Sequence, residues 1–100
     1  MSYDEMKLNY GLAEDMIRTL EQAYEQLQDT MQEMQSIANI LEEGALLGNG
    51  GSALTDVIRI NWCPSLSRLM DRLNEMTQDI QKTIAFMQEA DAGSRDMFSG

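Results

Sequence analysis

The chain has 100 residues, 43% of them apolar, and carries 17 acidic against 7 basic side chains, for a net charge of −10. This length predicts a single domain, and the apolar content is that of a folded protein. The acidic balance argues against nucleic acid and anionic membrane surfaces as partners, because binding to either needs a basic footprint.

The negative charge is concentrated in the first part of the chain. Residues 1–43 have a net charge of −8, whereas residues 44–100 have −2. We therefore expect the first part to face a less acidic partner. The N-terminus, "MSYDEMKLNY", lacks the basic-then-apolar pattern of a cleaved signal peptide, and no apolar run is long enough for a membrane span. The sequence therefore predicts neither the general secretory route nor a membrane span.

The first predicted element is a long helix over about residues 4–43. Its apolar residues recur at alternating intervals of three and four, which places one narrow seam along a helix. The seam positions are Tyr3, Met6, Tyr10, Ala13, Ile17, Leu20, Tyr24, Leu27, Met31, Met34, Ala38 and Leu41. Gly44 supplies the usual stop.

A second, weaker apolar set lies beside this seam. Its members are Leu8, Leu12, Met16, Ala23 and Ile37. They either widen the buried stripe, as in any bundle helix, or form a second packing face that joins another molecule. These residues are therefore candidates for a dimer face.

A glycine-rich stretch at 44–51 separates the first helix from the rest. The sequence "LLGNGGSAL" begins at Leu46 and holds three of the seven glycines, which adopt positive φ without steric cost. We predict a tight reversal of the chain there.

The second predicted helix covers about residues 52–92, with Ser52 as its cap. Its apolar residues again recur every three or four positions: Leu54, Ile58, Trp62, Leu66, Leu69, Leu73, Met76, Ile80, Ile84 and Met87. A flanking line of Met70, Thr77 and Ile84 completes the candidate dimer face. Two arms of similar length predict an all-α, antiparallel two-helix hairpin, paired with another hairpin into a four-helix bundle dimer, and residues 93–100 form a flexible tail.

Pro64 interrupts the second arm, because proline removes a backbone hydrogen bond and clashes with the preceding turn. The apolar spacing continues through it, which favours a kink near residues 61–64. The other interpretation is a main helix that starts at Pro64 after a short separate helix over 52–61. Trp62 is predicted to anchor the core.

Catalytic chemistry is poorly represented. The chain has no histidine, and its carboxylates avoid the seam, which argues against a bundle metal site. The glycine cluster follows no strand and has no Lys-Ser/Thr after it, unlike a phosphate-binding loop. Cys63 has no histidine to activate it and is interpreted as a packed thiol. We predict a non-enzymatic protein without cofactor or metal.

The turn and the tail resemble those of the WxG-motif small secreted proteins, the early-secreted-antigen-like substrates of bacterial type VII secretion. In that family a Trp-x-Gly turn is followed by small residues and a large apolar residue; here Leu46 and Gly48 form L-x-G, and Leu54 is the large residue. The tail is similar in its acid, its small residues and the apolar pair Met97-Phe98.

Two departures from the family pattern qualify this resemblance. Leu46 replaces the tryptophan, which in the family is implicated in contact with the secretion ATPase, although a leucine motif occurs on the targeting domains of large toxins of the same system. The export signal Tyr-x-x-x-Asp/Glu is not present in strict form: Phe86 is followed four residues later by Ala90, and Asp91 is preceded four residues earlier by Met87. This difference implies export together with a partner.

The resemblance implies a binding function, in a protein that is secreted without a cleaved signal peptide, or cytoplasmic before export. The protein would act as a secreted substrate or as the small partner of a secreted effector, recognised by the secretion ATPase and pairing with itself, a related small helical protein or an effector's N-terminal helical domain. The alternative is an intracellular coiled-coil adaptor, a secretion chaperone, or a hairpin subunit that polymerises.

Overall fold

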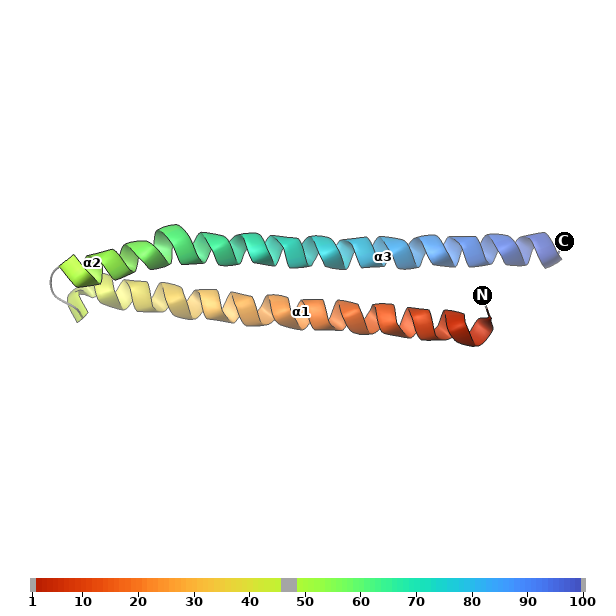
Figure 1. Ribbon diagram of the computed structural model, residues 1–100, viewed down its shortest axis with the longest axis horizontal. Coiled ribbons are helices and arrows are strands. Elements are labelled where there is room, and N and C mark those ends of the chain that lie inside the picture. The colour runs from red at the N-terminus through yellow and green to blue at the C-terminus, as the bar shows by residue number, and fades with distance from the viewer. Residues whose placement is uncertain (1, 46–48, 100) are drawn as a thin grey trace.

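The computed structural model describes residues 2–45 and 49–99, and the side chains of residues 2–44 and 51–91. Two long helical arms lie side by side in opposite directions and form a rod of 77 × 18 × 15 Å (Figure 1). The first arm is α1 (Tyr3–Ile40), continued by the segment η1 (Leu41–Ala45), in which the chain kinks at Gly44. The second arm is α2 (Asn49–Asp56), the π-helical η2 (Val57–Trp62) and α3 (Cys63–Ser99). The predicted all-α helical hairpin is confirmed.

The first arm begins and ends where its sequence signals place it. Ser2 caps α1: its Oγ accepts a hydrogen bond from the backbone N–H of Glu5 at 3.2 Å, and Asp4 and Glu5 lie in the first turn, where acids suit the helix dipole. At the other end, Gly44 has a φ of 97°, in the left-handed region that glycine adopts without strain.

The second arm differs from the prediction at both ends. It begins at Asn49, three residues before the predicted cap at Ser52. Gly51 is buried, and its carbonyl accepts a hydrogen bond from Thr55 Oγ1 at 2.9 Å, so this glycine belongs to the packed helix rather than to the turn. At the C-terminal end, α3 continues as helix to Ser99, through the segment predicted as a tail.

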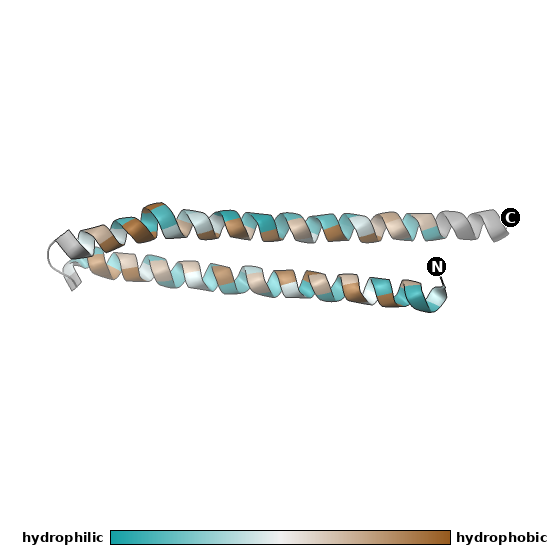
Figure 2. Ribbon diagram, in the orientation of Figure 1, coloured by the Kyte–Doolittle hydropathy of each residue, from teal (hydrophilic) through white to brown (hydrophobic). Residues whose placement is uncertain are grey.

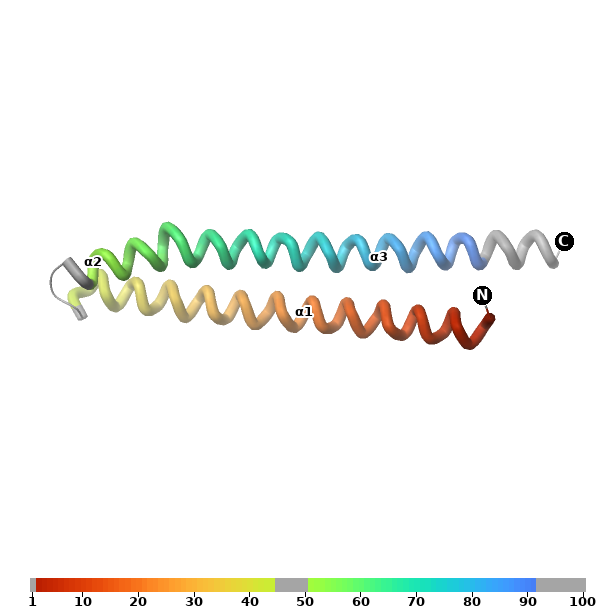
Figure 3. The backbone as a smooth tube through the Cα atoms, viewed as in Figure 1, coloured from red at the N-terminus to blue at the C-terminus, as the bar shows by residue number. Residues whose placement is uncertain are grey.

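Pro64 neither breaks the second arm nor starts a new helix. The chain widens into the π-helical η2 just before it, visible as a raised turn in the green part of the trace (Figure 3). The N–H of Cys63 donates to the carbonyl of Ile58, five residues back. A π turn inserts one extra residue into the helix and makes room for a proline that cannot donate a hydrogen bond.

The core is the seam between the arms, and in α1 it is the predicted one. Every predicted seam residue from Met6 to Leu41 is buried or half-buried, whereas Tyr3, at the open end, is exposed. Hydrophobic residues, coloured brown, recur at intervals along both arms (Figure 2). Among the residues whose side chains are described, the only buried apolar side chains are Ala38, Ile58 and Met70, so the core is thin.

The seam of the second arm agrees with the prediction at six positions and differs from it by one residue at three others. The six are Ile58, Leu66, Leu73, Ile80, Ile84 and Met87. Trp62, Leu69 and Met76 were predicted to face α1, but each is 45–49% exposed. The buried or half-buried line is Ile58, Cys63, Leu66, Met70, Leu73, Thr77, Ile80, Ile84, Met87 and Asp91. Relative to an uninterrupted helix that continues from Ile58, the extra residue in η2 shifts the seam by one, from Trp62, Leu69 and Met76 to Cys63, Met70 and Thr77.

Candidate interaction surface

The register between the arms is marked by a hydrogen bond near the open end. Tyr10 Oη donates to Asp91 Oδ2 at 2.5 Å. Steps of seven residues along both arms from this pair place Ile17 opposite Ile84, and Tyr24 opposite Thr77. The next two steps align the half-buried Met31 with Met70, and the buried Ala38 with Cys63. These aligned layers define which exposed side chains lie at the same height.

One long side of the rod is polar, and we call it the polar edge. The seam of each arm consists of two lines at seven-residue spacing. The first line runs through Tyr10 and Ile17 in α1 and through Met70 and Thr77 in α3; the second runs through Ala13 and Leu20 and through Leu66 and Leu73. The polar edge consists of the residues that directly follow the second line. They are Lys7, Glu14, Glu21, Gln28, Gln35 and Glu42 in the first arm, and Ser67, Asn74, Gln81 and Gln88 in the second. A shallow groove confirms that the two sets share a side, because Glu21 lines it together with Asn74 and Gln81.

An ion pair joins the arms on this edge near the end of the rod at which α2 begins, which we call the elbow. Arg59 reaches Glu42 at 3.0 Å and donates to Asn39 Oδ1 at 2.8 Å. Both charged side chains are about half exposed, so we expect the pair to contribute at most about 1 kcal/mol to stability. Its main consequence is to fix how the second arm lies against the first next to the π turn.

The opposite long side is apolar, and we call it the apolar edge. Its central members each precede a seam residue: Met16, Ile37, Leu54, Trp62, Leu69 and Met76. Leu12, Ile40 and Phe86 lie next to them on the outer surface. All nine are exposed. Because the arms are antiparallel, the residues that come directly before the first seam line lie on the same side of the rod in both arms.

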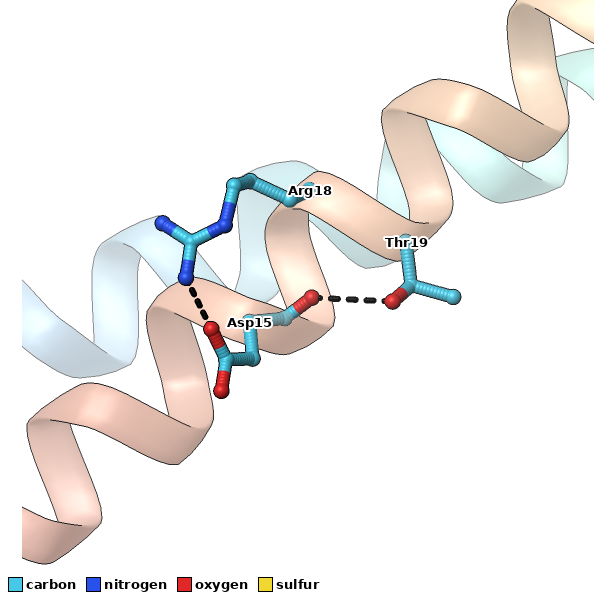
Figure 4. Close-up of polar contacts among 3 residues, drawn as sticks. All are labelled: Asp15, Arg18 and Thr19. Atoms are coloured by element: carbon cyan, nitrogen blue, oxygen red, sulfur yellow. Dashed lines mark hydrogen bonds and ion pairs between the residues drawn. The ribbon is translucent and has the colours of Figure 1, made fainter.

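Charge is absent from the central line of the apolar edge. The remaining positions that precede the first line of seam residues, from Tyr10 to Ala38 and from Cys63 to Ile84, are Asn9, Ala23, Thr30 and Thr83. The charged residues of α1 lie elsewhere. Figure 4 shows one such group, in which Arg18 pairs with Asp15 while Thr19 Oγ1 donates to the Asp15 carbonyl at 3.0 Å. The hairpin thus separates an apolar edge, whose central line is uncharged, from a polar one.

The candidate dimer face from the sequence is partly corrected. Leu8, Leu12, Met16 and Ile37 are exposed, and the small Ala23 is half-buried. Met70 and Thr77 were assigned to this face, but they are 6% and 8% exposed and lie in the seam, and Ile84 is half-buried there. The displacement by η2 explains these errors, since it turns Met70 inward and Leu69 outward.

Sequence reasoning missed several members of the apolar edge. Trp62, Leu69 and Met76 were placed in the core, and Ile40 was not singled out. A signal for the correct seam exists, however. Backwards from Met87, the positions of α3 follow a strict alternation of three and four as far as Cys63, whereas the predicted line contains two successive steps of four, from Met76 through Ile80 to Ile84.

The motif residues of the resemblance fall in three different surroundings. Leu46 and Gly48 lie outside the described residues, as do the side chains of Met97 and Phe98. Leu54 is 38% exposed on the apolar edge. Of the remaining residues, Phe86 is 72% exposed, Met87 is half-buried in the seam, and Asp91 accepts the hydrogen bond from Tyr10.

The polar residues of the described part do not assemble around a metal-sized site. No three His, Cys, Asp or Glu side chains there lie close enough to hold an ion. Cys63 is a half-buried free thiol that lines a shallow groove with Gln35, Asn39 and Arg59. No helix of the described residues is both long and apolar enough to cross a membrane.

Comparison with known proteins returned no relative. No family model, curated protein sequence or solved structure matches the chain. Function is therefore argued from the hairpin and its surface.

Proposed function

We propose that this chain is a non-enzymatic protein of bacterial type VII secretion, exported as a substrate or as the small partner of a secreted effector. It acts by pairing its hairpin with another helical hairpin and by presenting its C-terminal segment as an export signal. The observation that carries the proposal is the apolar edge, a line of exposed apolar side chains along both arms that a lone hairpin leaves in water.

The shape of the molecule supports this assignment. Two helical arms of similar length lie side by side, and the L-x-G sequence occupies positions 46–48 of the sequence, between the end of the first arm at Ala45 and the start of the second at Asn49. Leu54, the large residue of the turn motif, lies one helical turn from the buried Gly51 and contributes to the apolar edge. A partner bound to that edge would therefore also contact the elbow.

The C-terminal part divides its residues between folding and recognition. Asp91 accepts a hydrogen bond from Tyr10, so it stabilises the open end of the hairpin. Phe86 points into solvent, one turn earlier. In this proposal the secretion ATPase recognises Phe86 together with the apolar pair Met97-Phe98, while Asp91 holds the second arm in place.

An export assay tests the proposal. We expect the protein in the culture medium of cells with active type VII secretion, and its loss from the medium when the secretion ATPase is deleted. The double variant Met97→Ala Phe98→Ala should reduce export about tenfold or more, because it removes the apolar pair, while the helix content of the purified protein stays unchanged.

A matched control is Ser94→Ala Ser99→Ala, which alters the same segment without touching the apolar pair. It should be exported normally. Retention of the wild-type protein in the cytosol under active secretion would overturn the proposal in favour of an intracellular adaptor or chaperone. Long polymers of the purified protein would favour a polymerising hairpin subunit instead.

A further inference from the structure

We infer that the groove on the polar edge is a docking site for an arginine side chain, carried by a basic segment of a protein partner. The groove lies on the side of the rod opposite the apolar edge, so it stays in contact with water when another hairpin covers that edge. The inference therefore adds a second surface to the molecule and depends neither on the pairing nor on the export in the proposed function.

The groove is formed between the two arms, midway along the rod. It lies at the layer in which Tyr24 is opposite Thr77, and side chains of both arms line it. Its volume is about 380 Å³. Pockets for small ligands begin at about 300 Å³, so the groove has room for one long side chain.

Both walls of the groove carry hydrogen-bond acceptors. In α1, Glu21 and Glu25 lie one helical turn apart and supply two carboxylates. In α3, Asn74, Gln78 and Gln81 supply side-chain amides, whose carbonyl oxygens also accept hydrogen bonds. The residues that line the groove include no Lys or Arg. This lining favours a cation with several N–H donors over an anion or a neutral group.

The two carboxylates are not neutralised within the described part of the hairpin. Both glutamates are exposed, and neither takes part in an ion pair among the side chains that the structure describes. Like charges four residues apart on a helix repel one another. A cation bound between Glu21 and Glu25 would relieve this repulsion, and the net charge of −8 over residues 1–43 would attract it.

The apolar part of the lining favours arginine over lysine. Tyr24, Leu20 and Leu73 line the groove and are half-buried. The leucines offer an apolar surface to the methylene stem of a long side chain, and the tyrosine offers an aromatic ring on which a planar guanidinium stacks. A guanidinium also presents five N–H donors in one plane, which acceptors on two facing walls can share, whereas an ammonium is a compact point charge.

A second hollow shows what the first arm offers without the second. Asp29 and Glu33 also lie four residues apart, and they line this hollow together with Gln32, Ser36 and Ile37. All of these residues belong to α1, and none is aromatic. The hollow therefore supplies acidic charge without the amides of α3 or an aromatic ring, and it serves as a control site.

A peptide titration followed by NMR tests the occupant. The probe is a short glycine peptide with two arginines and blocked ends, added to the isotope-labelled full chain at an ionic strength of about 0.1 M. We expect the side-chain amide signals of Asn74, Gln78 and Gln81 to shift, because these groups line the groove. The same peptide with lysines should bind at least about threefold more weakly. The peptide with citrullines, which keep the shape of arginine without its charge, should not bind.

Matched pairs of variants test the site. Glu21→Gln Glu25→Gln removes both carboxylates with little change of size, and it should weaken binding of the arginine peptide at least about fivefold. Asp29→Asn Glu33→Gln removes the same charge from the control hollow. It should weaken binding less than about twofold, because only screened long-range attraction is lost. Circular dichroism should report equal helix content in both variants.

A third variant tests the contribution of the second arm. Gln78→Ala Gln81→Ala removes two exposed amides and leaves the net charge unchanged. It should weaken binding of the arginine peptide at least about twofold, because the α3 wall then offers fewer acceptors.

Three results would overturn the inference. Equal weakening by the two acidic pairs would replace the groove with a diffuse acidic surface. Lysine and arginine peptides of equal affinity, or full binding to Gln78→Ala Gln81→Ala, would rule out recognition of a guanidinium between the arms. Absence of any shift in the groove amides at millimolar arginine peptide would rule out the docking site itself. None of these results bears on the proposed function, which the export assay measures separately.

Discussion

Two buried threonines show how polar side chains are accommodated in this thin core. Thr55 Oγ1 donates to the Gly51 carbonyl at 2.9 Å, and Thr77 Oγ1 donates to the Leu73 carbonyl at 3.1 Å. Each hydroxyl is thus satisfied by the preceding turn of its own helix and needs no partner across the seam. A satisfied hydroxyl still contributes less than a methyl group would at a buried position.

Replacement of the Thr77 hydroxyl should therefore stabilise the protein. Thr77→Val keeps the β-branched shape, and its methyl group adds apolar burial at a position 8% exposed. We expect the free energy of unfolding to rise by about 0.5–1 kcal/mol, measured by urea denaturation.

The matched control is Thr19→Val. Thr19 makes the same bond to a carbonyl four residues earlier, at 3.0 Å, but it is exposed, so its replacement should change stability by less than about 0.5 kcal/mol. Destabilisation by Thr77→Val alone would contradict the argument and assign the hydroxyl a role across the seam.

Among the elements, the π turn η2 decides which side chains the second arm displays. The first arm has an uninterrupted spacing, so its seam could be predicted from the sequence residue by residue. In the second arm, two neighbouring lines of residues at heptad spacing are both largely apolar. The first runs through Trp62, Leu69 and Met76, and the second through Cys63, Met70 and Thr77. Hydropathy favours the first line, because it contains no threonine. The structure follows the second, because one extra residue before Pro64 rotates it inward.

The same element explains which functional inferences could come from the sequence. The exposed stripe of α1 was predictable as far as Met16 and Ile37, because the α1 seam was correct. Its counterpart on α3 was not, since an error of one residue moves Leu69 from the surface into the core. A π turn leaves no direct signature in composition, although Pro64 marks where it occurs.

Pro64→Ala should stabilise the second arm without moving its register. Alanine restores a backbone N–H and has the higher helix propensity, so we expect a gain of about 1–3 kcal/mol in the free energy of unfolding. The seam residues after Pro64 already pack on α1, which keeps the displaced register. Ser67→Ala, at an exposed position of the same helix, serves as the control and should change stability by about 0.5 kcal/mol at most.

Trp62 reports whether the register stays in place. It is 46% exposed in the hairpin, so its fluorescence should keep a red-shifted maximum in Pro64→Ala, measured at a concentration where the chain is monomeric. A blue shift would mean that the second arm has turned Trp62 into the seam, and it would contradict the argument that packing after Pro64 fixes the register.

At the scale of the whole molecule, the hairpin is far from compact. Its radius of gyration is 22.2 Å, against about 13 Å for a compact domain of 100 residues. Most seam residues are only half-buried, because each helix has a single neighbour. A lone hairpin therefore gains little from apolar burial, and covering the apolar edge would add a large fraction of its total stability.

Stability should consequently depend on protein concentration. In a pairing between two copies of this chain, the second copy would bind the folded chain and not the unfolded one, so mass action would raise Tm as concentration increases. Over a 100-fold range we expect a rise of about 5–10 °C, from roughly 1–1.5 kcal/mol per copy at 4–8 °C per kcal/mol. The variant Leu69→Glu Met76→Glu places two carboxylates on the apolar edge, so its Tm should not depend on concentration and should equal that of the wild-type protein at the lowest concentration. The variant Ser67→Glu Asn74→Glu places them on the polar edge and should keep the concentration dependence.

Salt provides an independent measurement on the same molecule. Two copies of net charge −10 repel one another, and the polar edge and outer surfaces that carry this charge remain in water. Raising the ionic strength from 0.01 to about 0.15 M shortens the Debye length from about 30 to 8 Å. If two copies pair, this change should raise the Tm of the wild-type protein more than that of the variant Leu69→Glu Met76→Glu. An equal rise in both would mean that repulsion acts only within one chain, and would contradict pairing between copies.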